Sequence, residues 1–297
     1  MSADAPYRSG MVALAGRPNV GKSTLANALS GMHLAAVSPR PQTTRRRIAM
    51  AVHGEGWQAV LLDIPGFQTP RDALTRRMQA TVDDTLADCD AAVLMVNAAE
   101  AIAGGDRFIA ERLRASTLPT VVVVNKVDLS RPDRIAAAIA QAAELVPDFV
   151  SVHPVSALTG EGLDALRADL PGVLPEGPPY FPEGLVTDQT LEEMAAELIR
   201  EAALVRLREE VPHALAVQVE EVAPGRRGVH VDAAILVETD SQKGIVVGRG
   251  GAMIRDIGSA ARRALGVVWD AEVHLNLVVK VRRRWREDEG MLRRLGL

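Results

Sequence analysis

The chain has 297 residues, 47% of them apolar, and a formal net charge of −4. This length suits roughly two domains of ordinary size, and the apolar content is enough to fill two cores. The overall charge gives no indication of a nucleic-acid partner, so only the local distribution of charge can reveal one. The single cysteine, Cys89, excludes an intramolecular disulfide and an all-cysteine metal site. We interpret it as a small buried hydrophobic residue in a protein of a reducing cytosol.

No basic segment followed by an apolar one opens the chain, so no secretory leader is expected. The densest apolar run lies around residues 121–124 and is too short to span a bilayer. We therefore expect a soluble, cytoplasmic protein.

Short apolar runs alternate with helix-like segments through the first half of the chain. Runs of buried-strand length occupy residues 11–15, 59–62, 91–96 and 120–124. This alternation predicts an α/β domain, a mostly parallel sheet with helices on both faces. Ligands of such sheets bind outside the carboxyl ends of the strands, so motifs that follow these runs should converge.

The segment Gly16–Ser23, GRPNVGKS, matches the phosphate-binding pattern G-x-x-x-x-G-K-[ST] between a strand-like run and a helix-like segment. Gly16 and Gly21 let backbone N–H groups point at phosphate oxygens, and the following helix presents its positive end. We expect Lys22 to contact the β- and γ-phosphates and Ser23 to bind Mg²⁺. The expected ligands in this phosphate loop are Gly16, Asn19, Val20, Gly21, Lys22, Ser23 and Thr24.

Two further motifs follow apolar runs. The sequence from Asp63 to Gly66, DIPG, fits the D-x-x-G element, whose aspartate orients magnesium and whose glycine contacts the γ-phosphate, although the same pattern is common in turns. The sequence from Asn125 to Asp128, NKVD, is more specific, because its carboxylate can accept from the ring N–H and exocyclic amine of guanine, where adenine has no donors. The motifs predict a preference for GTP. The expected base contacts are Asn125, Lys126, Asp128, Ser156, Ala157 and Leu158.

The composition changes at residues 170–184, which are rich in proline and glycine and predict a connection between domains. We expect a GTPase domain over residues 1–174, a linker over 175–184 and a second domain over 185–297. In the second domain residues 191–207 have helical spacing of apolar residues.

The rest of the second domain has an ordered set of predicted elements. Pro212 is expected to end the helical region, residues 215–222 and 229–237 are strand-like, and a third strand is expected over 274–281. The run Val247–Ile254, VGRGGAMI, resembles the V/I-G-x-x-G-x-x-I signature of KH domains, in which a loop between two helices clamps single-stranded nucleic acid. One helix, two strands, two helices and a strand is the bacterial, type II arrangement of this α+β domain. The expected RNA contacts of the loop are Gly248, Arg249, Gly250 and Gly251.

The second domain has a strongly basic part. Between Ser241 and Arg286 ten Lys and Arg residues accompany three acidic residues, a local charge of +7. This predicts an RNA-binding surface, with a surface salt-bridged to the acidic helix around residues 192–210 as the alternative. Trp285 is expected either to stack on a base or to pack in the fold. The additional residues expected to bind RNA are Lys280, Arg282, Arg283, Arg284 and Trp285.

All these motifs occur in the order found in GTP-binding proteins, and nearly the whole chain resembles the bacterial Era GTPases, which join a P-loop GTPase domain to a KH domain. The tail over residues 279–296 also resembles that family. The resemblance implies binding of GTP, GDP and Mg²⁺, binding to the 3′ end of 16S ribosomal RNA, assistance in maturation of the small ribosomal subunit and no obligate oligomer. It does not follow from the residues alone which RNA is bound.

The segment Pro41–Arg45, PQTTR, resembles the first switch of these GTPases, in which a threonine ligates Mg²⁺. By this resemblance Thr44 is the ligand, with Thr43 as the alternative. The run Arg45–Arg47 is interpreted as a solvated basic run, with direct contact to RNA or nucleotide as the alternative. Ile64 stands where the family usually has threonine, which changes packing more than chemistry.

Phe67 stands where small signalling GTPases carry a glutamine that orients the attacking water, and a phenyl ring cannot form those hydrogen bonds. Asn19 matches a position that is associated with potassium in Era-related GTPases, so K⁺ is a possible cofactor, with loop geometry alone as the alternative role. The expected catalytic residues are Asn19, Lys22, Thr44, Asp63 and Gly66, and the expected metal ligands are Ser23, Thr44 and Asp63.

Two other classes of function stay open at this point. One is a structural RNA-binding module with a vestigial nucleotide site. The other is a peripheral signalling GTPase on the inner face of the membrane, because the basic residues 280–286 could meet anionic lipid.

Overall fold

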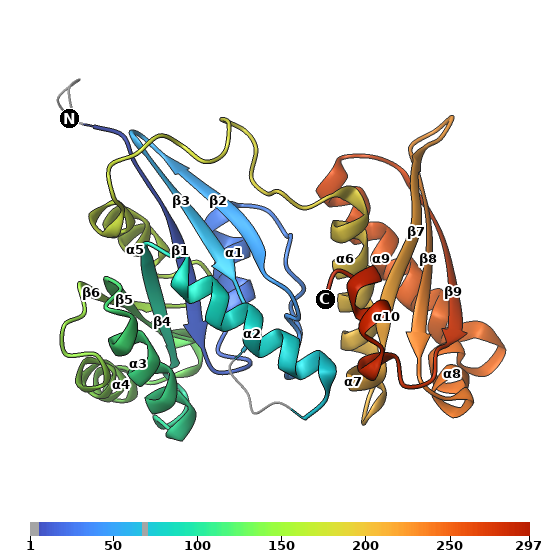
Figure 1. Cartoon of the computed structure of the whole chain (residues 1–297), viewed down its shortest axis with the longest axis horizontal. Helices are drawn as coiled ribbons and strands as arrows, with labels where there is room; N and C mark the ends of the chain where they lie inside the picture. Colours follow the sequence, from blue (N-terminus) through green and yellow to red (C-terminus); the bar gives the residue numbers. More distant parts are fainter. Residues whose placement is uncertain (1–5, 67–70) are drawn as a thin grey trace. The chain divides into compact units, whose positions relative to one another are not determined.

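The computed structural model describes residues 6–66 and 71–297. Contacts divide the described residues into two compact units (Figure 1). The first unit comprises the described residues within 1–32, 46–68 and 79–188, and the second those within 33–45, 69–78 and 189–297. Two segments of the N-terminal half therefore belong by their contacts to the unit formed by the C-terminal residues. The predicted domain boundaries, which are continuous in sequence, remain a prediction.

The first unit has a six-stranded sheet in the order β2-β3-β1-β4-β5-β6. Neighbouring strands are parallel except β2 and β3, which are antiparallel. The four apolar runs of the sequence lie in β1, β3, β4 and β5, as predicted, while β2 and β6 had not been predicted. The strands are β1 Arg8–Gly16, β2 Ile48–Gly54, β3 Trp57–Asp63, β4 Ala91–Asn97, β5 Thr120–Asn125 and β6 Ser151–Val155.

Helices cover the faces of this sheet, so β4 and β5 are buried throughout. Buried residues of α3 and α4 pack against the alternate β4 residues Ala92, Leu94 and Val96. Figure 1 shows α1 on the opposite face of the sheet. The helices are α1 Lys22–Ser30, α2 Ala73–Ala87, α3 Gly104–Ser116, α4 Pro132–Leu145 and α5 Leu163–Asp169, with 3₁₀ turns η1 Val127–Leu129 and η2 Leu170–Val173.

The beginning of the predicted linker is hydrogen-bonded to the first unit. The backbone N–H of Ser9 donates to the carbonyl of Pro175 at 3.0 Å, and that of Gly177 donates to the carbonyl of Tyr7 at 3.0 Å. The buried Gln58 side chain accepts from the N–H groups of residues 180 and 181. This part of the linker is thus an ordered extension along β1 and β3.

The second unit contains the predicted helix, two strands, two helices and strand in that order, with a short additional helix, α7, between the first helix and the first strand. Its sheet has the order β7-β8-β9, with β7 antiparallel and β9 parallel to β8. The prediction that Pro212 ends the first helix is wrong: α6 ends at Arg206, and Pro212 lies in the next helix, α7. The elements are α6 Leu191–Arg206, α7 Val211–Ala214, β7 Ala216–Pro224, β8 Val229–Val237, α8 Asp240–Val247, η3 Arg249–Gly251, α9 Ala252–Trp269, β9 Val273–Val281, η4 Trp285–Glu287 and α10 Glu289–Arg294.

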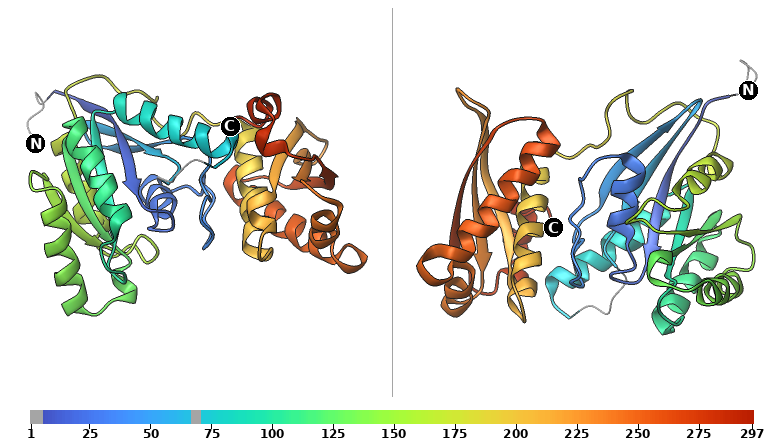
Figure 2. Two further views of the ribbon diagram at one scale, coloured as in Figure 1. Left: turned by 60° about the horizontal axis from the view of Figure 1, so that its bottom comes forward. Right: turned by 180° about the vertical axis from the view of Figure 1, so that it is seen from behind.

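The two faces of this sheet have different cores. On one face α6 and α9 pack against β8 residues of one parity, including Ala233 and Ile235 (Figure 2). On the other face Ala234 and Leu236 pack with Trp285 and with residues of α2 and α10. Because successive strand residues point to opposite faces, β8 is buried on both.

The environment of Cys89 and the length and polarity of the helices bear on two expectations from the sequence. Cys89 is buried, and burial is the largest cause that raises the pKa of its thiol to about 12, so it is the small hydrophobic residue expected from the sequence. Among the described residues, the helices are all too short or too polar to cross a bilayer.

Candidate functional site

The phosphate loop joins β1 to α1, and its glycines are required by close contacts. A Cβ atom at Gly21, where φ is 107°, would lie 2.3 Å from Nδ2 of Asn125. A Cβ atom at Gly16 would lie 2.9 Å from the carbonyl oxygen of Met95. Asn19 also has a positive φ, 63°. The loop therefore curls as the phosphate-binding interpretation requires, and α1 starts at Lys22, within the Gly16–Ser23 segment.

Lys22 is almost fully buried beneath this loop. Its ammonium donates to the carbonyl oxygens of Gly16, at 3.1 Å, and Arg17, at 3.3 Å. Burial lowers the pKa of Lys22, and the nearby carboxylate of Asp63 opposes that shift. An ammonium has three hydrogens, so these two carbonyls leave one to donate to a phosphate oxygen.

Ser23 and Asp63 meet at the start of α1 and the carboxyl end of β3. The hydroxyl of Ser23 donates to Oδ2 of Asp63 at 2.6 Å. Hydroxyl and carboxylate oxygens are the ligands that Mg²⁺ prefers, so this pair fits the metal expected here. Close by, a Cβ atom at Gly66 would lie 2.9 Å from Cγ of Pro18, so only glycine fits against the phosphate loop. Asp63 is itself fully buried.

Asn125 ties the loop to the predicted base site. Its Nδ2 donates to the carbonyl of Val20 at 2.8 Å, and its Oδ1 accepts from the N–H of Ala157 at 3.0 Å. Lys126 donates from Nζ to the carbonyl of Asn19 at 2.7 Å. The structure thus brings the phosphate loop, the N-K-x-D element and the 156–158 loop into one polar cluster.

The remaining predicted base contacts flank this cluster. Asp128 lies exposed in η1, where its carboxylate is accessible to a ligand. Ser156 is buried and accepts from the N–H of Thr159 at 3.1 Å, which shapes the loop. Leu158 is 79% exposed. Their contact with a base stays a prediction.

The predicted switch residues are distributed differently. Thr43 and Thr44 belong to the second unit, where the Thr43 hydroxyl donates to the carbonyl of Arg40 at 2.6 Å. A magnesium ligand from this segment therefore stays a prediction. Ile64 is fully buried in a core cluster of the first unit, in agreement with an effect on packing. Phe67 lies outside the described residues.

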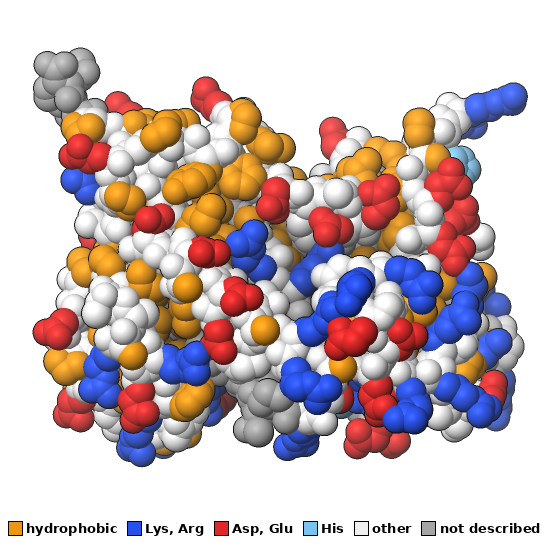
Figure 3. Space-filling model, in the orientation of Figure 1, with side chains coloured by type: hydrophobic (Ala, Val, Ile, Leu, Met, Phe, Trp, Pro, Cys, Tyr) orange, Lys and Arg blue, Asp and Glu red, His pale blue; other side chains and the backbone are white. Residues whose placement is uncertain are grey.

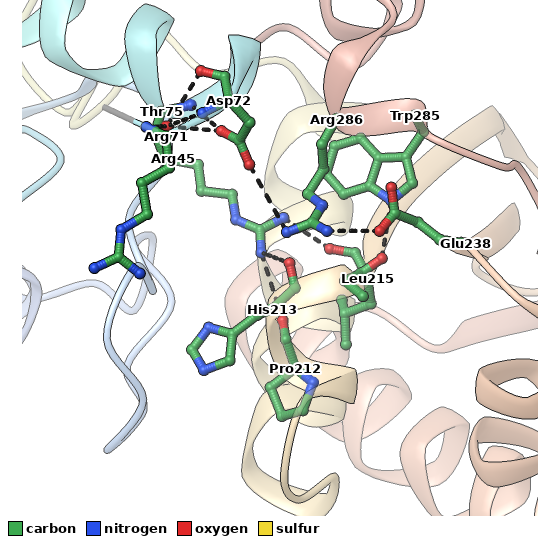
Figure 4. A network of polar contacts seen from close by, with 11 residues as sticks. Arg45, Arg71, Asp72, Thr75, Pro212, His213, Leu215, Glu238, Trp285 and Arg286 are labelled. Atoms are coloured by element: carbon green, nitrogen blue, oxygen red, sulfur yellow. Dashed lines mark hydrogen bonds and ion pairs between the residues drawn. The ribbon is translucent and has the colours of Figure 1, made fainter. Parts of the chain in front are cut away.

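Arg45 corrects the interpretation of the basic run as solvated. Its side chain is buried, and the guanidinium donates to the carbonyl of Leu215 at 2.7 Å and to the carbonyls of residues 212 and 213 (Figure 4). The pKa of the Arg45 guanidinium is lowered to about 9, mainly because the group is buried. Contact with RNA or nucleotide is also excluded for a side chain so enclosed, although Arg47 is exposed.

Trp285 does not offer a base-stacking surface, so its inclusion among the RNA-binding residues is wrong. The indole is 1% exposed and donates from Nε1 to the carbonyl of Ala214 at 2.8 Å. The guanidinium carbon of Arg45 lies 5.7 Å from the ring centroid. Next to it, Arg286 lies 2.7 Å from the carboxylate of Glu238 and 3.8 Å from that of Asp72 (Figure 4). The packing alternative is the one that the structure supports.

The G-x-x-G loop lies between α8 and α9, as predicted, and its backbone is open. Gly248, Gly250 and Gly251 have positive φ angles of 70°, 56° and 76°. Apart from its two chain neighbours, none of the described residues would have an atom within 4 Å of a Cβ atom at Gly250. Arg249 is exposed beside it. The geometry suits close approach of a nucleic-acid backbone.

Figure 3 shows many Lys and Arg side chains on the visible face of the second unit, and several of the other predicted cations form ion pairs. Lys280 pairs with Glu220, Arg284 with Glu287, and Arg283 lies 3.9 Å from Asp240. None of these partners belongs to the acidic helix around residues 192–210 that the sequence had suggested. Exposed ion pairs of this kind contribute little stability, so phosphates can replace the carboxylates. Arg282 lines a cavity of about 240 Å³ beside Gln218 and Arg294.

Comparison with known proteins gives a family match for each half of the chain. Residues 11–126 match the family described as 50S ribosome-binding GTPase, and residues 210–286 match the KH domain family. The chain is 46% identical to the GTPases Era of Mycolicibacterium paratuberculosis and Mycobacterium tuberculosis, over 98% of this chain and 99% of each relative.

Two solved structures match almost the whole chain with a TM-score of 0.93 and 34% identity. One is an Era variant of Aquifex aeolicus bound to GDP.AlF4−, which covers 97% of this chain and 99% of that one. The other is Era in complex with MgGDPNP and nucleotides 1506–1542 of 16S ribosomal RNA, with 98% and 99% covered. The chain therefore belongs to the Era family of GTPases.

Proposed function

We propose that this GTPase uses GTP and Mg²⁺ in its first unit, binds the 3′ end of 16S ribosomal RNA with its KH domain, and assists maturation of the small ribosomal subunit. The observation that carries the nucleotide part is the contact of Ser23 with Asp63 beside the glycine-lined loop and Lys22. The RNA part is supported by the open G-x-x-G loop and by the similarity to the Era structure with RNA.

In this proposal each element at the carboxyl edge of the sheet has one task. Lys22 donates to the β- and γ-phosphate oxygens, and Ser23 and Asp63 hold Mg²⁺. Thr44, with Thr43 as the alternative, is kept as the proposed switch ligand, although its segment groups with the second unit. Bound Mg²⁺ neutralises charge that develops on the phosphates. The N–H of Gly66 donates to the γ-phosphate, and Asp128 accepts from guanine.

A monovalent cation is proposed for the site near Asn19. Its positive φ places the residue in the curl of the phosphate loop, and its carbonyl is held by Lys126. K⁺ there would offset charge on the transferred phosphoryl group as an arginine finger does. Such help is needed if position 67 supplies no hydrogen bond to the attacking water.

Single-stranded RNA is proposed to cross the G-x-x-G loop, with Arg249 at a phosphate. Further phosphate contacts come from Lys280, near the end of β9, and from the exposed Arg282, Arg283 and Arg284 that follow the strand. The domain boundaries near residues 174 and 185 separate the two activities.

The experiment that tests the proposal is crosslinking of the full-length protein to RNA in cells, followed by sequencing of the RNA. Reads that concentrate at the 3′ end of 16S ribosomal RNA are expected, and reads without such a maximum would contradict the RNA part. GTP hydrolysis by the purified protein in Mg²⁺ tests the nucleotide part separately.

We propose that the protein resides in the cytoplasm. A peripheral membrane role is supported by one observation: Arg282, Arg283 and Arg284 are exposed and could meet anionic lipid. Sedimentation with anionic liposomes, with and without competing RNA, separates the two. Binding that RNA abolishes indicates a shared basic surface, whereas no binding leaves the cytoplasmic role alone.

A further inference from the structure

The phosphate loop has a second set of contacts, at its first residue after Gly16, that no sequence motif predicted. Nε of Arg17 donates to Oδ1 of Asp106 at 2.8 Å, and its Nη2 lies 3.1 Å from Oε2 of Glu100. The Asp106 side chain is 1% exposed. A buried carboxylate requires a cation or several donors, so the contact with Arg17 is strongly favoured over separation.

Both carboxylates are themselves fixed to secondary structure. Oδ2 of Asp106 accepts from the N–H of Ala103 at 2.8 Å, at the N-terminus of α3. Oε1 of Glu100 accepts from Nδ2 of Asn97 at 2.6 Å, and Oδ1 of Asn97 accepts from the N–H of Ala99 at 3.0 Å. Asn97 is the last residue of β4. Arg17 is thus attached to the end of a central strand and the start of a helix.

The backbone carbonyl of Arg17 connects this residue to the rest of the loop by hydrogen bonds. Its carbonyl accepts from Nζ of Lys22 at 3.3 Å and from the N–H of Val20 at 3.4 Å. The next residue, Pro18, is the one against which Gly66 packs. A displacement of Arg17 therefore moves an acceptor of Lys22 and the surface that faces the D-x-x-G glycine.

We propose that Arg17, held by Asp106 and Glu100, is a positioning residue for nucleotide binding. It fixes the first half of the phosphate loop, as Asn125 and Lys126 fix the second half through the carbonyls of Val20 and Asn19. The inference rests on the proposed nucleotide site. Because the phosphate loop contacts phosphates that GTP and GDP share, a displaced Arg17 weakens the binding of both nucleotides and raises KM more than it lowers kcat.

Two neighbouring glycines of α3 provide a matched test. A Cβ atom at Gly105 would lie 3.0 Å from Cδ of Arg17. Outside its chain neighbours and the adjacent backbone of α3, a Cβ atom at Gly104 would have no described atom within 4 Å. Gly105→Ala and Gly104→Ala change helix propensity in the same direction, but only the first presses on Arg17. We expect Gly105→Ala to raise the Kd of fluorescent GDP and GTP analogues about threefold, or about 0.65 kcal/mol, and Gly104→Ala to leave both unchanged.

Charge variants test the same contact from the other side. Asp106→Asn keeps the shape and an acceptor for the Ala103 N–H but removes the charge, so both Kd values should rise about tenfold with kcat within about twofold of wild type. Arg17→Lys, which keeps the cation, should restore part of the affinity that Arg17→Met loses.

The results of these experiments distinguish a failure of the positioning role of Arg17 from a failure of the proposed nucleotide site. Equal Kd values for Gly104→Ala and Gly105→Ala, together with wild-type affinity in Asp106→Asn, would overturn the positioning role. A lower kcat at unchanged KM would overturn it as well. If the wild-type protein bound neither nucleotide analogue, the proposed nucleotide site would be at fault instead. Should Asp106→Asn prove unfolded by circular dichroism, the glycine pair still decides the question.

Discussion

At the scale of single residues, Asp128 decides which base the proposed site accepts. Its carboxylate is exposed after β5, next to residues that hold the phosphate loop. In Asp128→Asn the amide can donate to the carbonyl that replaces the amine of guanine in xanthine. We expect a change of preference from GTP toward xanthosine triphosphate, with a loss of roughly 1.5–3 kcal/mol in GTP affinity. Competition between the two nucleotides measures it, and unchanged discrimination would exclude Asp128 from the base pocket.

Asn19 carries the prediction about monovalent cations. Hydrolysis should be faster in potassium than in sodium at equal ionic strength, because the cation offsets charge on the phosphoryl group. Glycine adopts the φ of 63° at this position without strain and has no side-chain oxygen, so Asn19→Gly should bind GTP and lose the difference between the salts. Steady-state rates in matched chloride salts test this. Equal rates for the wild type would leave water positioning to other groups.

The sequence patterns did not predict correctly which charged and aromatic side chains are buried. Arg45 and Trp285 both stand in strongly basic stretches, which suggested solvent or RNA, yet both are buried against backbone carbonyls near α7. Arg17 gave no signal, because its partners Glu100 and Asp106 lie more than eighty residues away in sequence. Charge along a sequence does not reveal which charges find a partner through the fold.

At the scale of elements, central strands were predictable and edge strands were not. β1, β4 and β5 lie inside the sheet and form apolar runs, whereas β2 and β6 lie at its edges. β6 contains Pro154, which edge strands tolerate but which weakens the pattern. The apolar residues 48–52 of β2 are visible in the sequence, but this strand was not predicted.

The loop between α8 and α9 carries the prediction for RNA binding. Replacing Arg249 and Gly250 with aspartates puts two carboxylates against the expected path of the phosphates and a side chain where none is present. Affinity for a short pyrimidine-rich RNA should fall by at least about tenfold, or about 1.4 kcal/mol, with a weaker salt dependence. Basal GTP hydrolysis should survive, because the phosphate loop lies in the other unit. If a folded double variant bound this RNA as tightly as wild type, the loop would be only a helix turn.

The segment over residues 33–45 contains a pH-dependent contact with α6. Nε2 of His33 lies 2.5 Å from Oε2 of Glu201, and this hydrogen bond is the largest cause that raises the pKa of His33 above 6.5. A raised pKa in the folded state means that the stabilisation is complete below pH 6.5 and is lost as the pH rises through the folded value. The stability difference between wild type and His33→Asn should therefore be larger at pH 5.5 than at pH 8.

Chemical denaturation at the two pH values measures this difference. Glu201→Gln serves as the control, since without the carboxylate the His33→Asn substitution should have the same small effect at both. A wild-type advantage that grows toward alkaline pH would contradict the assignment.

At the scale of the whole chain, the sequence predicted two consecutive domains, whereas the contacts interleave two units. The described residues 33–45 and 71–78 precede most of the first unit in sequence and still group with the second. Motifs report local chemistry, so GTPase and KH elements were recognisable. The grouping depends on tertiary contacts such as those of Arg45 and Asp72, which have no motif.

Trp285 contacts several of these separate parts of the second unit. Its replacement by a small residue should therefore destabilise all of them. Its indole packs in one cluster with Leu74 of α2 and Leu292 of α10, donates to Ala214 and lies under the guanidinium of Arg45. Trp285→Ala should destabilise the second unit by about 3–5 kcal/mol, because it leaves a cavity and an unpaired carbonyl. Amide hydrogen exchange should then accelerate at residues 33–45 and 71–78 together with 285–297, and stay slow in β1.

The neighbouring Arg284→Ala is the matched control, since that side chain is 80% exposed and its partner Glu287 lies on the same turn. It should leave the exchange of all these segments as in wild type. If Trp285→Ala accelerated exchange only over 285–297, residues 33–45 would be held by Arg40 and His33 through their contacts with Leu207 and Glu201 rather than by the indole. If instead exchange rose equally in β1, the two units would unfold together, and the separation of nucleotide and RNA activities by single substitutions would not be expected.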